Sequence, residues 1–585
     1  MILSHKIILA ITRRSTLTAR RFLSSQPPTS RTLRSPLSSR KLTYAATVSL
    51  GLLAVTLSPS QGVVEVEEPK TLITGTRPKK ESMSTLIRTY VVYSICSIPP
   101  LITYAPAALS FCQSIPGLKQ IAEAMVRVTF FDQFVGADTA EETIPLLKSF
   151  REQNKGVMLV YSVEVDEKAA KARGSPSRKG SGPAQYRKNV EEIIHSIDVA
   201  GDFEDRHGRP GVAAGRKTWV ALKLSALVPS ADALKHLSSH LLDARPQDRL
   251  VHYPGTPQPT DLDVLSLTKP PVDSPLTVDD LDALRTLRND LRRICLKAKQ
   301  RDVKVVMDAE YTRYQAAIDA FQLSLMREFN TVEKKSRERQ ESHTQPLVYG
   351  TYQAYLCRNT MHLIRSLELA QKEKFILGVK LVRGAYHDQE LGVASPYDPD
   401  LNLVKQRVTE EIPAPEDGVR LPEYKMGSTS PVWNEKWETD GAFNGAALML
   451  VDQLKWKEPQ IGVMFATHNK ESCDITIRSL VANGLATAQP GTSQVRVDDR
   501  IVDRLSFGQL YGMSDALTDH LASTLISSSP IILKYLPYGS LAEVIPYLGR
   551  RAIENKSVLG AASGGAADER RRAGKEIWRR LTGET

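Results

Sequence analysis

A short segment near the C-terminal end of the chain places an unusual set of side chains on one helix face. In SLAEVIPYLGRRAIENKS (residues 540–557), Tyr547, Arg550, Arg551 and Glu554 follow the spacing i, i+3, i+4 and i+7, so they share one side of an α-helix. Paired guanidinium groups match the two oxygens of a carboxylate. A solvated face with an Arg–Glu pair would show the same spacing. The surroundings of this helix therefore decide its role.

Those surroundings are predicted by eight short apolar runs, separated by segments long enough to hold a helix. The runs begin at Gly156, Trp219, Asp302, Pro346, Ile376, Ile461, Asp503 and Pro530. Continuous apolar runs are typical of strands buried on both faces. Their alternation with helical segments predicts an α/β fold, a (βα)₈ TIM-like barrel with an N-terminal helical extension.

Polar residues gather at the C-terminal ends of these runs, which is the catalytic face of such barrels. They are Lys223, Asp308, Glu310, Gln353, Lys380, Arg383, His468, Asn469, Gln509 and Tyr535. If polar residues only marked where strands exit into solvent, they would be equally common at the N-terminal ends of the runs. They are not. We therefore expect the helix after the eighth run to lean over the barrel mouth.

At that mouth, Lys223 could converge with Arg550 and Arg551 on an anion, while Tyr547 closes over a small aliphatic ring. The implied substrate is a small amphipathic carboxylate. The chain has no GxSxG, HExxH or Cys–His pairing, and no GxGxxG after a strand. The chemistry must then come from a bound cofactor, whose phosphates Arg383 and His468 could contact.

The formal charge of +11 does not indicate a nucleic-acid partner. Residues 1–64 contain nine Lys or Arg and no acidic residue, which leaves 68 basic against 66 acidic side chains in the remainder. An acid-free segment rich in Arg and Ser is typical of a mitochondrial presequence. The five cysteines form no CxxC pair or Cys/His cluster, so we predict neither a disulfide framework nor a metal site.

Two apolar stretches bear on membrane attachment. Residues 42–59 are almost free of charge but are at the short end for a membrane span. We interpret them as a possible membrane anchor, and the sequence does not favour either outcome. Residues 89–112 are interrupted by Pro99, Pro100 and Pro106 and are interpreted as helices packed on the catalytic body.

Seven motifs resemble those of the mitochondrial proline dehydrogenase (proline oxidase) family, in the same order. They are VMDAE (306–310), TYQAYL (351–356), GVKLVRGAY (378–386), ATHN (466–469), FGQLYGM (507–513), YLPYG (535–539) and YLGRRAIEN (547–555). The resemblance covers roughly residues 120–560 and implies a distorted (βα)₈ barrel that binds FAD non-covalently. It also implies oxidation of L-proline to Δ1-pyrroline-5-carboxylate, with electrons passed to the membrane quinone pool of the mitochondrial inner membrane, on the matrix side.

The resemblance also implies a role for each matching residue. Arg550, Arg551 and Lys223 resemble the substrate carboxylate clamp, Tyr547 and Tyr386 the ring-packing residues, and Glu554 the partner that orients the arginines. Asp308 and Tyr535 resemble a hydrogen-bonded pair beneath the site and, with Lys223, are the expected catalytic residues. The expected FAD contacts are Gln353, Lys380, Arg383, Thr467, His468 and Asn469.

Two departures limit this transfer. Lys380 stands where bacterial members carry an Arg, and residues 426–446 match the family poorly, so no role is carried over there.

Two alternatives stay open. A hydroxyproline dehydrogenase would share the barrel, although Tyr547 occupies room that a ring hydroxyl would need. A non-catalytic inner-membrane scaffold would use the apolar stretches and the basic tail at residues 568–581.

The expected organisation follows from these patterns. Residues 1–64 hold the presequence and the possible membrane segment, 65–150 a helical extension, 151–560 the FAD-binding barrel and 561–585 a basic helical tail. Insertions are expected near 168–188, 256–276, 327–342 and 388–433, the last of which is placed where a lid could be.

Overall fold

The structure is a computed structural model of the chain. It describes residues 81–115, 117–162, 183–208, 216–246, 248–331, 345–393, 401–413, 418–422, 430–456, 460–557 and 565–583. The predicted presequence and the possible anchor at residues 42–59 lie outside these ranges. The described residues all belong to one compact unit, residues 70–585.

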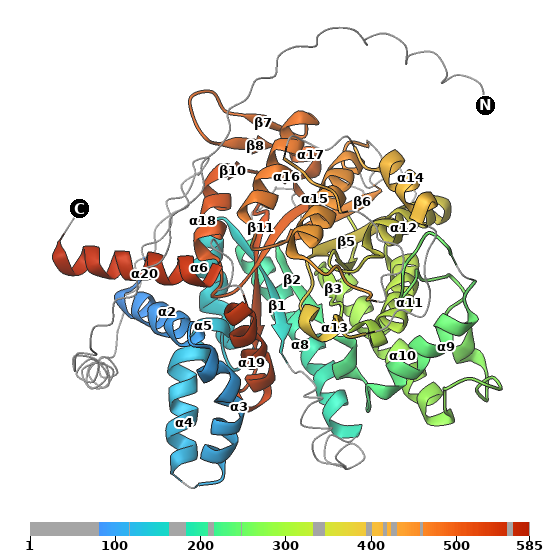
Figure 1. The fold of residues 1–585 in the computed structure, drawn as a ribbon, viewed down its shortest axis with the longest axis horizontal. Coiled ribbons are helices and arrows are strands. Elements are labelled where there is room, and N and C mark those ends of the chain that lie inside the picture. The colour runs from blue at the N-terminus through green and yellow to red at the C-terminus, as the bar shows by residue number, and fades with distance from the viewer. Residues whose placement is uncertain are drawn as a thin grey trace, which may run out of the picture. The chain divides into compact units, whose positions relative to one another are not determined.

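The centre of this unit is a closed barrel of eight parallel strands, which confirms the predicted (βα)₈ fold (Figure 1). Each barrel strand coincides with one of the eight predicted runs, with β1 and β2 beginning one residue earlier. In barrel order they are β1 (Lys155–Tyr161), β2 (Thr218–Leu222), β3 (Val305–Met307), β4 (Val348–Gln353), β5 (Leu377–Val382), β6 (Ile461–Ala466), β9 (Leu505–Leu510) and β11 (Ile532–Tyr538). Neighbours in sequence order therefore pair around the whole barrel.

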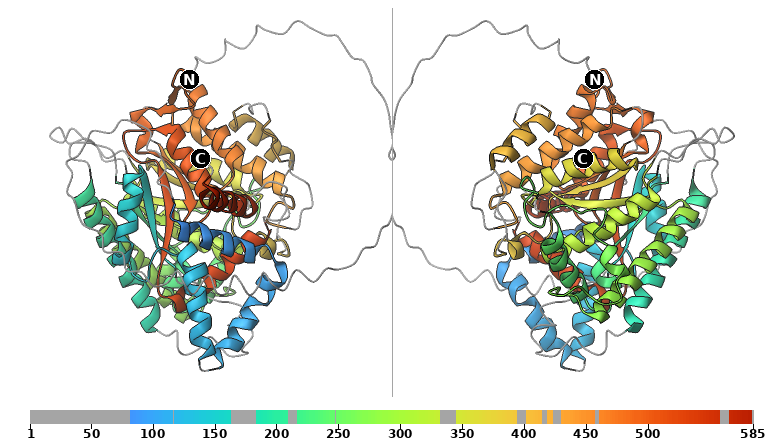
Figure 2. Two further views of the ribbon diagram at one scale, coloured as in Figure 1. Left: turned by 90° about the vertical axis from the view of Figure 1, so that its left-hand side faces the viewer. Right: turned by 90° about the vertical axis from the view of Figure 1, so that its right-hand side faces the viewer.

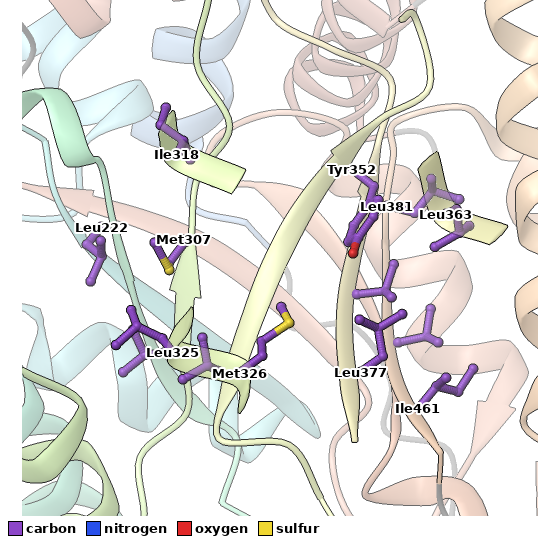
Figure 3. Packing of buried hydrophobic residues seen from close by; sticks show 14 of the residues in the cluster. Leu222, Met307, Ile318, Leu325, Met326, Tyr352, Leu363, Leu377, Leu381 and Ile461 are labelled. Carbon is purple, nitrogen blue, oxygen red and sulfur yellow. The ribbon is translucent and has the colours of Figure 1, made fainter. Parts of the chain in front are cut away.

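Side chains along each strand alternate between the outer helices and the barrel interior. On the outside, Met307 and Leu381 belong to the large core shared with Ile318 and other helix residues (Figure 3). On the inside, Trp219 and Tyr349 fill the lumen with their ring centroids 4.8 Å apart. The interior is thus packed toward the N-terminal ends of the strands, and a cavity can form only toward the C-terminal ends.

Helices follow the strands and cover the barrel. They are α8 (Pro183–His207), α9 (Asp232–Ala244), α10 (Val278–Arg301), α11 (Thr312–Phe329), α12 (Asn359–Glu373), α13 (His387–Glu390), α14 (Leu401–Glu411), α15 (Lys436–Gln453), α16 (Lys470–Ala482), α17 (Asp499–Val502) and α18 (Asp515–Thr524). A small sheet of β7 (Ala486–Ala488), β8 (Val495–Val497) and β10 (Leu525–Ile526) lies apart from the barrel and was not predicted.

The described residues before β1 are mostly helical. It contains α2 (Met83–Cys96), α3 (Pro99–Gln113), α4 (Leu118–Val126), the π-helix η1 (Arg127–Phe131), α5 (Asp132–Phe134), the 3₁₀ turn η2 (Glu141–Thr143) and α6 (Ile144–Glu152). The last of these packs beside β1. The prolines expected to interrupt the apolar stretch include Pro99 and Pro100, which open α3, where a missing N–H costs nothing.

The helix after the eighth strand, α19 (Leu541–Ser557), has two buried sides. Val544 and Leu548 pack against Tyr93 and Phe134 of the N-terminal helices. The adjoining side carries Tyr547, which belongs to the same buried cluster, and the two arginines. Helix α20 (Gly565–Thr582) runs beside α2 (Figures 1 and 2).

The predicted insertions fall partly outside the described residues. Residues 256–276 form a loop with a 3₁₀ turn, η4 (Asp263–Ser266), while residues 183–188 already belong to α8 and residues 327–329 to α11. Within 388–433, α14 and the ends of the excursion are described. The domain boundaries themselves remain predictions.

Candidate active site

Strand register explains why chemically active side chains face the barrel mouth. Val306 and Ala221 point into the lumen, and a step of two residues along each strand gives Asp308 and Lys223. The same parity turns Lys380 inward, because Leu381 and its alternate neighbours face the outer core. Alternation along the strands thus places these polar groups above the packed part of the lumen.

These side chains line one cavity of about 420 Å³ at the C-terminal ends of the strands. Almost every predicted site residue lies on its wall: Lys223, Asp308, Gln353, Lys380, Arg383, Tyr386, Thr467, His468, Tyr535, Tyr547, Arg550, Arg551 and Glu554. This size is in the range of small-molecule sites. Strands and α19 therefore contribute to one site, as expected for a helix that leans over the mouth.

Asn469 is the predicted residue that does not line the cavity. Its side chain accepts a hydrogen bond of 3.1 Å from the Ser472 backbone N–H and so caps the start of α16. Its own N–H donates to Thr467 Oγ1 at 3.0 Å. An Asn directly before a helix is a recognisable cap signal in the sequence, so this structural role could have been weighed there.

The α19 face forms a cationic wall braced by one carboxylate. Arg551 is only 4% exposed and donates to Glu554 Oε1 at 2.6 Å, whereas Arg550 Nη1 lies 3.7 Å from the same oxygen. The Arg551 guanidinium carbon is 5.0 Å from the Tyr547 ring centroid, and that of Arg550 is 5.4 Å from the Tyr386 ring centroid. Two arginines held between one acid and two aromatic rings are positioned to receive a second carboxylate.

The strand ends contribute a hydrogen-bonded triad to the cavity wall, in which Asp308 and Lys380 are buried and Tyr535 is partly buried. Asp308 accepts from Lys380 Nζ at 2.6 Å on one oxygen and from the Tyr535 hydroxyl at 2.6 Å on the other. The Lys380 ammonium also lies 5.0 Å from the Tyr535 ring centroid. Because both carboxylate oxygens are engaged, the three side chains hold one another in fixed orientations.

Arg383 is held by Thr467, an expected site residue, and by two residues that the sequence did not reveal, Asp440 and Ser472. Its Nε donates to Asp440 at 2.9 Å, its Nη2 to Ser472 Oγ at 2.7 Å, and its Nη1 to Thr467 Oγ1. Burial lowers the pKa of the Arg383 guanidinium, and the charge of Asp440 opposes that shift. Asp440 lies in the 426–446 region, to which no role was carried over, and no spacing signal links it to Arg383.

His468 is fixed as a neutral ring. Its Nε2 accepts a hydrogen bond of 3.0 Å from the Leu510 backbone N–H, which leaves the proton on Nδ1. Burial, together with the nearby charges of Lys534 and Arg551, lowers the pKa of His468 to about 3. This residue can therefore donate a hydrogen bond into the cavity region without carrying charge.

Lys223 stands next to a buried carboxyl, Glu310, that the sequence placed at the same end of the barrel. Burial raises the pKa of Glu310, while hydrogen bonds from Ser225 and the positive charge of Lys223 oppose the rise. The Ser225 N–H to Glu310 distance is 3.0 Å. This acid thus lies beneath the cationic side chain that faces the cavity.

Two features of the wall fit a planar ligand with a hydrogen-bond donor on its edge. Gln353 Oε1 is buried and has no hydrogen-bond partner among the residues that the structure describes, and a buried acceptor left without a donor is costly. Gly384 has φ of +132°, and a Cβ there would lie 2.4 Å from the Tyr355 ring. A glycine is therefore required here, and without a side chain its backbone can be approached closely by a ligand.

The site is a cavity with several cationic side chains on its wall, at the C-terminal ends of the strands of a closed parallel barrel, and comparison with known proteins defines its class. The family model described as proline dehydrogenase matches residues 152–409 and 422–563. The chain belongs to the proline dehydrogenase family, which confirms the resemblance seen in the motifs.

Individual relatives are distant in sequence. Hydroxyproline dehydrogenase of Rattus norvegicus is 28% identical over 501 residues, covering 86% of this chain and 92% of the relative. Mitochondrial proline dehydrogenase 1 is 27% identical over 506 residues in Arabidopsis thaliana, covering 85% of this chain and 84% of the relative. In Dictyostelium discoideum it is 26% identical over 488 residues, covering 83% and 71%.

Among solved structures, proline utilization A (PutA) from Bdellovibrio bacteriovorus, inactivated by N-propargylglycine, matches with a TM-score of 0.49 at 16% identity. The match covers 81% of this chain and 36% of that protein. The chain thus spans about a third of the length of that solved protein.

Proposed function

We propose that this enzyme oxidises L-proline to Δ1-pyrroline-5-carboxylate with bound FAD and delivers the electrons to a membrane quinone of the mitochondrial inner membrane. The observation that carries the proposal is the convergence of Lys223, Arg550 and Arg551 on one cavity with two tyrosine rings. An imino acid with one carboxylate and a small aliphatic ring matches this combination. Family membership supports the same reaction.

The residues of the chain have distinct tasks in this reaction. Lys223, Arg550 and Arg551 bind the carboxylate, and Glu554 keeps Arg551 pointed at it. Tyr386 and Tyr547 pack on the ring, and the triad around Asp308 fixes the floor of the site. Because the substrate is held at both its charge and its ring, positioning supplies much of the rate enhancement.

The residues expected to hold FAD are Gln353, Lys380, Arg383, Thr467 and His468, all on the cavity wall. The unpaired Gln353 oxygen suits the imide N–H of a flavin, and Arg383 suits a phosphate or ribityl oxygen. Bound FAD would supply the two-electron acceptor for the hydride that proline would lose from C5, while the amine would lose a proton and a C=N bond would form.

A visible absorbance spectrum tests this function. Purified holoenzyme should show flavin bands that bleach when L-proline is added without oxygen. A colourless protein, or flavin bands that L-proline leaves unchanged, would contradict the proposal and would favour the scaffold alternative.

Hydroxyproline dehydrogenation is the second candidate, because relatives with that name match over most of their length. Tyr547 is buried on the cavity wall, where we expect its ring to occupy the room that a ring hydroxyl would need, so kcat/KM should be higher for L-proline than for trans-4-hydroxy-L-proline. Replacing Tyr547 and Tyr535 by serine, one at a time, would identify the ring that excludes the hydroxyl. If neither variant shifts the ratio toward hydroxyproline, steric exclusion by these tyrosines is wrong.

A further inference from the structure

The helices α3 and α4 form a hairpin, residues 98–128, that projects from the body of the molecule (Figures 1 and 2). Four of its large apolar side chains, Tyr104, Phe111, Ile121 and Met125, are between 60% and 69% exposed. Ile98, Leu101, Ile115 and Val128 are also exposed. Large apolar side chains clustered on one projecting element are uncommon on a monomeric protein and mark an interaction surface.

The hairpin has little protein to pack against. No residue of α4 is buried, and among the described side chains of α3 only Ile102 is buried. Residues 89–118 contain no Asp, Glu, Lys, Arg or His. Moving the exposed apolar side chains of such a segment from water into hydrocarbon lowers the free energy.

Neither helix is long enough to cross a bilayer. Fifteen residues of α3 and nine of α4 correspond to about 22 Å and 14 Å at 1.5 Å per residue, against a hydrocarbon core of about 30 Å. Within the described ranges, no helix combines the length and the apolar character that a membrane span requires. Contact with lipid would therefore be made from one side of the membrane, as amphipathic surface elements do.

A basic helix, α20, packs beside α2, the helix that leads into the hairpin. Residues 565–583 contain six Lys or Arg and three Asp or Glu, and Arg570 of α20 donates a hydrogen bond of 2.9 Å to the hydroxyl of Ser97, the residue just before the hairpin. Its exposed face carries Arg571, Lys575 and Trp578 at the spacing i, i+4, i+7. Cationic groups beside an exposed tryptophan are suited to anionic headgroups.

The hairpin is also coupled to the active site. Ile102 of α3 belongs to the same buried cluster as Tyr547 and Leu548 of α19, the helix that forms the cationic wall. If the hairpin contacts lipid, the cationic wall of α19 is held near the membrane. An acceptor dissolved in the bilayer would then meet an enzyme already oriented toward it.

We propose that the α3–α4 hairpin, assisted by the exposed face of α20, docks this enzyme on the surface of an anionic lipid bilayer. The part of the proposal that concerns quinone access rests on the proposed function. The docking surface itself rests on the exposed apolar residues and the neighbouring positive charge.

Vesicle co-sedimentation of the full-length holoenzyme tests the docking. Wild type should bind vesicles of phosphatidylcholine mixed with phosphatidylglycerol, and the double variant Tyr104→Glu/Phe111→Glu should bind about tenfold or more weakly. The control is Val272→Glu/Leu296→Glu, which introduces the same charge at exposed apolar positions outside the hairpin and should bind as wild type does. Equal binding by wild type and the hairpin variant would overturn the proposal.

The contribution of α20 is measured separately. Arg571→Glu/Lys575→Glu should weaken binding to the anionic vesicles by about tenfold or more, at about fivefold per charge near the surface, and leave the weaker binding to pure phosphatidylcholine unchanged. If wild type binds neither vesicle but dimerises in sedimentation velocity, and Tyr104→Glu/Phe111→Glu is monomeric, the hairpin is a contact between copies and the lipid proposal is wrong.

Activity with two acceptors separates this proposal from the proposed function. The hairpin variant should keep wild-type proline oxidation with the soluble dye dichlorophenolindophenol and lose at least tenfold with a quinone incorporated in vesicles. No oxidation of proline by wild type with the dye would contradict the proposed function, whereas the vesicle-binding result would still decide the docking. Equal quinone activity of the two proteins would contradict a role of docking in electron delivery.

Discussion

Replacing Arg551 by methionine tests the centre of the proposed site. The side chain is 4% exposed and forms a hydrogen bond of 2.6 Å to Glu554, so methionine keeps the bulk but leaves Glu554 without its closest positive partner. Removing one partner of a buried charge pair costs about 2–5 kcal/mol. At about 1.4 kcal/mol per tenfold, kcat/KM for L-proline should fall by roughly 30- to 4,000-fold.

Steady-state assays with a soluble dye acceptor measure this loss, and the flavin spectrum shows whether the variant still folds and binds FAD. Arg550→Met should lose less, because the Arg550 side chain is more exposed and lies 3.7 Å from Glu554. Arg500→Met, at an exposed arginine outside the cavity, is the matched control and should retain wild-type activity.

Without Arg551, Glu554 keeps Arg550 at 3.7 Å but loses its shorter ion pair. Because its carboxylate could then itself disturb the site, the double variant Arg551→Met/Glu554→Gln is informative. If activity returns in the double variant, the loss came from the stray charge of Glu554. If activity stays low, the substrate has lost its own contact. A loss below threefold in Arg551→Met, with normal flavin content, would refute the carboxylate clamp.

Three further predictions follow from the contacts of single residues. Asp440→Asn removes the charge that holds Arg383, so FAD should bind about 10- to 100-fold more weakly in fluorescence titrations of the apoenzyme, and an affinity within twofold of wild type would contradict this role. Gly384→Ala should lower the free energy of unfolding by about 1–3 kcal/mol in urea titrations because φ is +132°, whereas Gly392→Ala, with open space around it, should change it by under about 0.5 kcal/mol. Burial and a neighbouring arginine lower the pKa of His362 to about 3. The unfolded chain therefore binds a proton below about pH 6.5 that the folded chain does not, and stability should fall with decreasing pH by up to about 1.4 kcal/mol per unit. His362→Gln should show a shallower slope between about pH 6 and 5, and an unchanged slope would rule out this assignment.

The barrel could be predicted because its signal is local. Each strand is a continuous apolar run, and the polar residue at its end follows from period-two alternation, as in the step from Ala221 to Lys223. The helix face with Arg550 and Arg551 is likewise a local pattern. Once the fold is a barrel, these local features can meet only at one mouth.

The supports of the site could not be predicted in this way. Asp440 reaches Arg383 only because a helix that follows a long excursion returns to the barrel, and nothing in the spacing of the two residues indicates that return. The pairing of Lys380 with Asp308 joins two different strands, so it depends on register around the barrel. For Asn469 a second, local signal was present beside the family motif, because an Asn directly before a helix also predicts the cap interaction that the structure shows.

Because α19 packs on Tyr93 and Phe134 and also carries the arginines that line the cavity, we expect that the eight strands alone are not the smallest active piece of this protein. A shortened chain that begins at β1 would keep every strand and lose the support behind its arginine wall. Damage to the N-terminal helices should then resemble an active-site defect, with weak substrate binding in a protein whose barrel is intact.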